Sequence, residues 1–165
     1  MKLKYVSWLP AVIIMIVIFC FSSKPADNSN ESSLTVANEI ITIYENITND
    51  QLNEDTRSEV LDTLNFFVRK GAHFSEYAIL AAAFAFHLLV LKRKGMLLYI
   101  LPVILSCFYA ATDEYHQTFV AGRTGMLRDV LIDTSGAALG SLIFTLCIIL
   151  SLRRSSHRQD KRIKS

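Results

Sequence analysis

The segment VLIDTSGAALGSLIFTLCIILSL, residues 130–152, is long and apolar enough to cross a lipid bilayer as one α-helix. The hydrocarbon core of a bilayer takes about 20 helical residues. Three further apolar segments, residues 5–22, 72–91 and 96–112, have comparable lengths. Hydrophobic residues make up 52% of the chain and gather in these segments, which excludes an ordinary soluble domain. The sequence therefore predicts an all-α integral membrane protein, built as a four-helix bundle.

The basic residues predict the orientation of the chain. Clusters of Lys and Arg precede the first apolar segment, join the second to the third and follow the fourth. Four crossings would place all three clusters on one side, and basic residues are enriched in cytoplasmic loops. We therefore expect a multi-pass plasma-membrane protein with both termini in the cytoplasm. Residues 1–152 would form the transmembrane domain with an extracellular insert at 23–68, and residues 153–165 a basic cytoplasmic tail.

The first apolar segment has two interpretations. Lysines precede it, as they precede the apolar region of a secretory signal peptide. The sequence that follows, SSKPADNS at 22–29, offers no clear small-x-small cleavage pattern. We favour an uncleaved membrane anchor, with a cleaved signal peptide as the alternative.

Two amphipathic helices are predicted within the insert, at residues 34–48 and 56–69, because apolar residues recur there at helical spacing. They would pack on the bundle, lie in the headgroup layer or cover a site as a lid. In the last span, Gly136 and Gly140 form a GxxxG pattern, and they follow Asp129 and Asp133 at steps of four, three and four. This face is expected to contact protein rather than lipid.

Ionisable residues gather near one end of three predicted spans. Counting about 20 residues from the basic ends puts them near the outer boundary. A charge facing lipid at the membrane centre costs ~2.5–3.5 kcal/mol, so these groups should be hydrated, paired or ligand-bound. We predict an interior polar pocket open to the outside; the alternative is a salt-bridge network that only aligns the helices. The candidates are Arg69, His73, Glu76, Asp113, Glu114, His116, Gln117, Arg123, Arg128, Asp129 and Asp133.

Three segments in order, FSSK at 21–24, RKGAHFSEY at 69–77 and TDEYHQTFVAGRTGMLRDVLIDTSGAALG at 112–140, resemble the motifs of the VanZ-like membrane proteins. The resemblance leaves out the acidic insert, and Lys24 stands where the family often has Gln. It implies low-level resistance to lipid-bearing glycopeptide antibiotics such as teicoplanin. It also implies a role for the motif positions Arg69, Lys70, His73, Glu76, Tyr77, Asp113, Glu114, Gln117, Arg123, Asp129, Asp133 and Gly136, whereas His116 comes from the physical argument alone.

Two functions follow from such a pocket. A binding protein would hold a lipid headgroup, a lipid-linked cell-wall precursor or a lipoglycopeptide; its partners would be membrane lipids, and nucleic acid is not expected. A small membrane enzyme would instead act on a lipid-linked phosphate or glycan. Its catalytic residues, or the ligands of a divalent metal, would come from His73, Glu76, Asp113 and His116. We prefer binding because no catalytic motif such as HExxH occurs, and transport is disfavoured because the inner halves of the spans lack charges.

Overall fold

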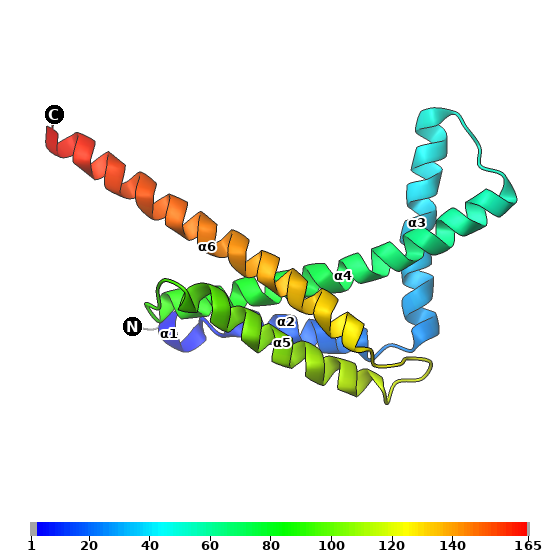
Figure 1. Ribbon diagram of the computed structural model, residues 1–165, viewed down its shortest axis with the longest axis horizontal. Helices are drawn as coiled ribbons and strands as arrows, with labels where there is room; N and C mark the ends of the chain where they lie inside the picture. Colours follow the sequence, from blue (N-terminus) through cyan, green and yellow to red (C-terminus); the bar gives the residue numbers. More distant parts are fainter. Residues whose placement is uncertain (1–2, 165) are drawn as a thin grey trace.

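The architecture consists of α-helices joined by short connections (Figure 1). The structure is a computed structural model that describes the backbone of residues 3–164 and the side chains of residues 3–154. No strand occurs among the residues 3–164. The helices are α1 (Leu3–Val6), α2 (Leu9–Ser22), α3 (Ala26–Thr48), α4 (Glu54–Val90), α5 (Leu97–Gln117) and α6 (Leu127–Lys164).

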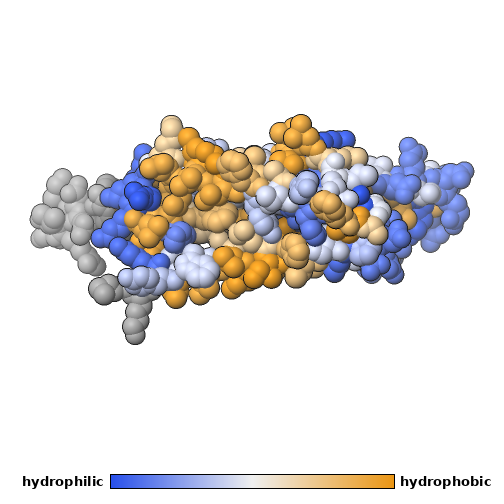
Figure 2. Space-filling model, turned by 90° about the horizontal axis from the view of Figure 1, so that it is seen from below, coloured by the Kyte–Doolittle hydropathy of each residue, from blue (hydrophilic) through white to orange (hydrophobic). Residues whose placement is uncertain are grey.

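Within this part of the chain, four helical segments are long and apolar enough to cross a membrane. They are α1 with α2, α4, α5 and the first 28 residues of α6, up to Arg154. Large apolar side chains remain exposed on them, among them Ile13, Phe108 and Ile143. Figure 2 shows an apolar surface over much of the bundle, with hydrophilic surface toward both ends. The predicted all-α membrane bundle is confirmed.

Glycines bring α4 and α6 into close contact. A Cβ atom added to Gly136 would lie 2.1 Å from the carbonyl oxygen of Phe74, and one added to Gly140 would lie 2.0 Å from that of Ala78. Both pairs are four residues apart, so the two backbones run against each other over a full helical turn. The GxxxG face of α6 therefore contacts protein, as its spacing predicts.

A single helix, α4, contains both the predicted insert helix at 56–69 and the second span. The side chain of Asn53 caps its start by accepting a hydrogen bond from the amide of Thr56 at 2.8 Å. No proline follows within α4, and the one glycine there, Gly71, costs a helix only about 1 kcal/mol relative to alanine. The helix therefore runs without a break from the insert into the bundle. The polar residues of the RKGAHFSEY segment lie on this continuous helix, where it crosses the expected membrane boundary.

The remaining insert helix, α3, runs across the direction of the bundle helices at the end away from the start of α1 (Figure 1). It is joined to α4 by polar contacts, including a bond from the Arg57 guanidinium to the Asn38 amide oxygen at 2.8 Å. Asn65 on α4 also donates to Asn30 on α3 at 2.7 Å. We call this end of the bundle the α3 end; the connection between α4 and α5 and the start of α1 lie at the opposite end.

Candidate functional site

A pocket of about 260 Å³ lies at the α3 end, where α2, α3, α4 and the connection between α5 and α6 meet. Four of the predicted site residues contribute to its wall: Arg69, His73 and Glu76 from α4, and Arg123 from the connection. The other lining residues come from α2, the α2–α3 connection, α3 and α4. They are Phe21, Lys24, Ser29, Ser32, Ser33, Val36, Val68 and Ala72.

The α4 residues share one helical face because they follow one another at steps of four and three. Nδ1 of His73 lies 3.8 Å from Oε2 of Glu76, which is too long for a hydrogen bond. Nδ1 of His73 and Nε of Arg69 are both buried without a hydrogen-bond partner. The α4 wall of the pocket thus contains buried polar atoms whose hydrogen-bonding capacity is unused.

Arg123 reaches the pocket from a tight turn. Gly122 before it has a φ of +72°, a left-handed conformation that glycine adopts without strain. Nε of Arg123 donates to the carbonyl oxygen of Lys24 at 3.0 Å, which ties the turn to the end of α2. Its Nη1 is buried without a partner. Burial and the charge of Arg69 lower the pKa of Arg123, whereas Asp113 and Glu114 raise it.

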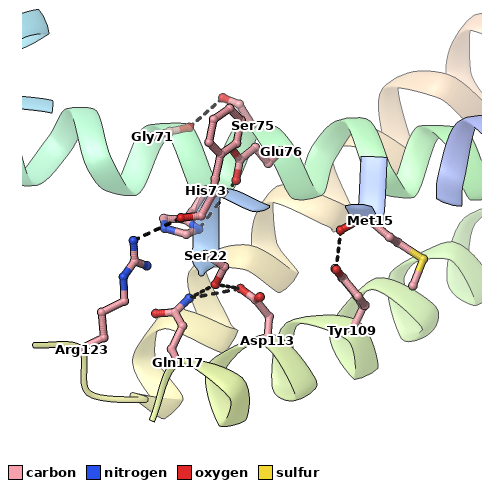
Figure 3. Close-up of polar contacts among 11 residues, drawn as sticks. Met15, Ser22, Gly71, His73, Ser75, Glu76, Tyr109, Asp113, Gln117 and Arg123 are labelled. Carbon is pink, nitrogen blue, oxygen red and sulfur yellow. Dashed lines mark hydrogen bonds and ion pairs between the residues drawn. The ribbon is translucent and has the colours of Figure 1, made fainter. Parts of the chain in front are cut away.

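A second polar group, beside the pocket, links α2 to α5. The hydroxyl of Ser22 donates to Oδ2 of Asp113 at 2.9 Å, and Nε2 of Gln117 donates to the same oxygen at 3.1 Å and to the Ser22 hydroxyl at 2.8 Å. All three side chains are buried. Figure 3 shows this triangle on the side of α4 that carries Glu76. Oδ1 of Asp113 has no hydrogen-bond partner.

Other predicted site residues are occupied by structural contacts. Nζ of Lys70 lies 2.6 Å from Oδ1 of Asp129, which joins α4 to α6. Oε2 of Glu114 accepts a hydrogen bond from the amide of Met126 at 2.8 Å and so fixes the turn before α6. These contacts fit the alternative in which ionisable groups align the helices.

Four more predicted residues also lie outside the pocket lining: Tyr77, Asp133, His116 and Arg128. Tyr77 and Asp133 are buried in the bundle, and the Tyr77 hydroxyl and Oδ1 of Asp133 have no hydrogen-bond partner. The His116 ring lies 4.7 Å from that of Phe19, centroid to centroid. Arg128 is exposed, with its guanidinium carbon 5.4 Å from the centre of the Phe66 ring.

The geometry gives the metal hypothesis no support of its own. Within the described side chains, no group of three or more His, Cys, Asp or Glu residues is placed to hold a metal ion. His73 and Glu76 lie on the α4 wall of the pocket, whereas Asp113 belongs to the hydrogen-bonded triangle.

The sequence model of the VanZ/LLP1 family matches residues 7–149, from just after α1 to well inside α6. The chain belongs to the VanZ/LLP1 family. The match spans α2, α4, α5 and the first part of α6, which together make up the membrane bundle, and all of the pocket-lining residues. No match was found among curated proteins or among solved structures.

In this VanZ/LLP1 protein, sequence reasoning allowed an insert helix as a lid but did not identify the serines of α3, or Ser22 at the end of α2, as site residues. Three serines of α3 line the pocket, and Ser22 of α2 completes the polar triangle. The FSSK segment signals Ser22, because serines at the end of an apolar helix need hydrogen-bond partners. The serines of α3 carry no comparable signal, since polar residues are ordinary in an exposed insert.

Proposed function

We propose that this VanZ/LLP1 protein binds the polar group of an envelope lipid or lipid-linked ligand in the pocket at the α3 end, and thereby provides low-level resistance to teicoplanin-type glycopeptides. The link to resistance comes from the resemblance of its motifs to the VanZ-like proteins. The binding role is supported by one observation above the others: the motif residues Arg69, His73, Glu76 and Arg123 come from two separate segments and line one pocket.

The size of the pocket favours a small polar group over a whole antibiotic. Its volume of about 260 Å³ lies just below the range of roughly 300–1,000 Å³ that is usual for drug-sized ligands. A lipid headgroup matches this volume, whereas a lipoglycopeptide is several times larger. We therefore favour a headgroup as the ligand, with resistance arising because the protein holds or shields an envelope lipid.

The proposed orientation is that the pocket faces the outside of the plasma membrane. The basic cluster Lys92–Arg93–Lys94 joins α4 to α5 at the opposite end of the bundle, and the exposed Arg153 and Arg154 follow the apolar part of α6. Basic residues favour the cytoplasmic side. A pocket at the α3 end would then meet the outer leaflet, where glycopeptides act.

The pairing of His73 with Glu76 on the pocket wall favours a second candidate, a membrane enzyme acting on a lipid-linked phosphate or glycan. An imidazole and a carboxyl group at this separation can take and return a proton once a substrate hydroxyl lies within hydrogen-bond distance of both. In this alternative Glu76→Gln abolishes turnover and leaves most ligand affinity intact. In a binding protein no turnover is found with either form.

The test is antibiotic susceptibility in a sensitive Gram-positive host that expresses the protein. We expect expression to raise the inhibitory concentration of teicoplanin but not that of vancomycin, which has no lipid tail. His73→Ala and Arg69→Gln should return it to that of the empty host. Arg128→Gln is the matched control, because its guanidinium lies outside the pocket. Full resistance in the His73 and Arg69 variants, at equal membrane abundance, would contradict the proposal.

A further inference from the structure

The pocket is richer in positive than in negative charge. Lys24, Arg69 and Arg123 line it together with a single carboxylate, that of Glu76. Among the described side chains, neither Arg69 nor Arg123 lies within salt-bridge distance of a carboxylate. The two guanidinium groups are close enough for Arg69 to lower the pKa of Arg123. Asp113 and Glu114 offset this repulsion in part, since they raise the pKa of Arg123, and an anion between the two guanidinium groups would offset it further.

The unused donors have the chemistry of a phosphate site. Nε of Arg69 and Nη1 of Arg123 are buried N–H groups without acceptors. Guanidinium groups bind phosphate oxygens through paired hydrogen bonds. On the α3 side of the pocket lie Ser29, Ser32 and Ser33, and hydroxyl groups can donate to further oxygens of the same anion.

The same pocket has an apolar part that opens to the surface. Phe21 and Val36 are lining residues, and their exposed fractions are 48% and 47%. Val36 begins a row of exposed apolar side chains on one face of α3, which continues through Ile40, Ile43 and Ile47 at steps of four, three and four. Since Val36 and Phe21 both line the pocket, the apolar row of α3 begins where the first span ends.

We propose that the pocket binds the phosphate of a membrane amphiphile, with the phosphate between Arg69 and Arg123 and the lipid tail leaving past Phe21 and Val36 beneath α3. This inference rests on the proposed function and gives its ligand a chemical class. An anion site with an apolar exit toward the bilayer selects a phosphate that is attached to a chain, because a free anion gains nothing from the apolar wall.

Binding is tested with full-length protein purified in a phosphate-free maltoside detergent, by native mass spectrometry. The probes are dodecyl phosphate, inorganic phosphate and dodecanol. We expect dodecyl phosphate to bind at least about tenfold more tightly than either of the others. Arg69→Gln should weaken it by about tenfold or more, and Arg128→Gln should leave it unchanged.

Arg123 is tested with Arg123→Lys, because its Nε also holds the end of α2 and a neutral residue there endangers folding. Lysine keeps the charge but cannot form the paired hydrogen bonds, so affinity should fall while thermal unfolding confirms a folded protein. Equal affinity for inorganic phosphate would overturn the lipid part of the inference. If neither dodecyl phosphate nor inorganic phosphate binds, the whole inference is overturned. The same holds if Arg69→Gln binds dodecyl phosphate with unchanged affinity.

Failure here and failure of the proposed function are distinguishable. Resistance that depends on His73 and Arg69, without affinity for either phosphate probe, leaves the proposed function standing and removes the phosphate ligand. Phosphate binding that needs Arg69, in a protein whose pocket variants keep full resistance, supports the ligand and removes its link to resistance.

Discussion

Gly140 of α6 and Ala78 of α4 face each other so closely that a Cβ atom at position 140 would lie 2.0 Å from the Ala78 carbonyl oxygen. Since the obstacle is backbone, Gly140→Ala has to push the two helices apart. We expect a loss of ~1–3 kcal/mol in unfolding free energy, the usual cost of overpacking. Thermal unfolding in detergent, followed by circular dichroism, measures it.

The same helix pair supplies a control for this prediction. Gly71 lies in α4 with no atom within 4 Å of an added Cβ. Gly71→Ala should therefore be neutral or stabilise the protein by ~0.5–1 kcal/mol, the gain expected from alanine in a helix. If both alanine variants unfold at the same temperature, the tight contact between α4 and α6 is wrong.

Lys70 and Asp129 form the ion pair that joins α4 to α6, with Nζ 2.6 Å from Oδ1 and both side chains 19% exposed. Removing one partner leaves the other charge poorly solvated, so Lys70→Ala and Asp129→Ala should each cost up to ~3–5 kcal/mol, the limit for a buried pair. The double variant should lose less than the sum of the two. A double-mutant cycle of unfolding free energies measures the coupling, and additive losses would argue against the pair.

Ser22 connects the end of α2 to Asp113 and Gln117 through a single hydroxyl group. Ser22→Ala leaves buried polar atoms of Asp113 and Gln117 with fewer partners, which costs ~1–3 kcal/mol. Ser23→Ala is the matched control, because its hydroxyl bonds only to the carbonyl oxygen of Phe19 in the last turn of α2, the helix that Ser23 follows. Thermal unfolding of both variants compares them, and equal stability would show that the triangle contributes little.

The fold could be predicted from the sequence because membrane spans are set by length and apolarity, which single segments display. Contact along Gly136 and Gly140 was predictable for a related reason, since their spacing and the acidic residues at steps of four and three before them mark one face. The α4 part of the pocket, Arg69 with His73 and Glu76, followed from helical spacing in the same way.

The remainder of the site depends on tertiary contacts that spacing does not encode. The lining of the pocket by α3 arises from how α3 lies against α4. The position of α6 determines that Lys70 pairs with Asp129 instead of facing the pocket. It also determines that Arg128 lies over the ring of Phe66. Depth counted along each span placed all these residues at one level but could not say which of them share a cavity.

The orientation of the bundle is testable with single cysteines in a background where Cys20, Cys107 and Cys147 are replaced by serine. We expect a cysteine at Asn46 to react with a membrane-impermeant maleimide from outside intact cells. A cysteine at Arg93 should react only after the cells are opened. Both positions are exposed, so reactivity reports the side of the membrane and not burial. The reverse pattern would put the pocket in the cytoplasm and remove the proposed contact with the outer leaflet.

The exposed apolar row on α3 predicts how this helix lies on the membrane. Ile43 and Ile47 are 55% and 76% exposed, whereas the polar Thr42 and Asn46 lie on another face of the same turns. A helix of this kind buries its apolar face roughly 5–10 Å into the interface. In the cysteine background above, reconstituted into vesicles, a polarity-sensitive fluorophore at Ile43 or Ile47 should emit at shorter wavelength than one at Thr42 or Asn46. Equal emission at all four positions would mean that α3 stands clear of the bilayer, and the lipid would then have no apolar path from the pocket beneath this helix.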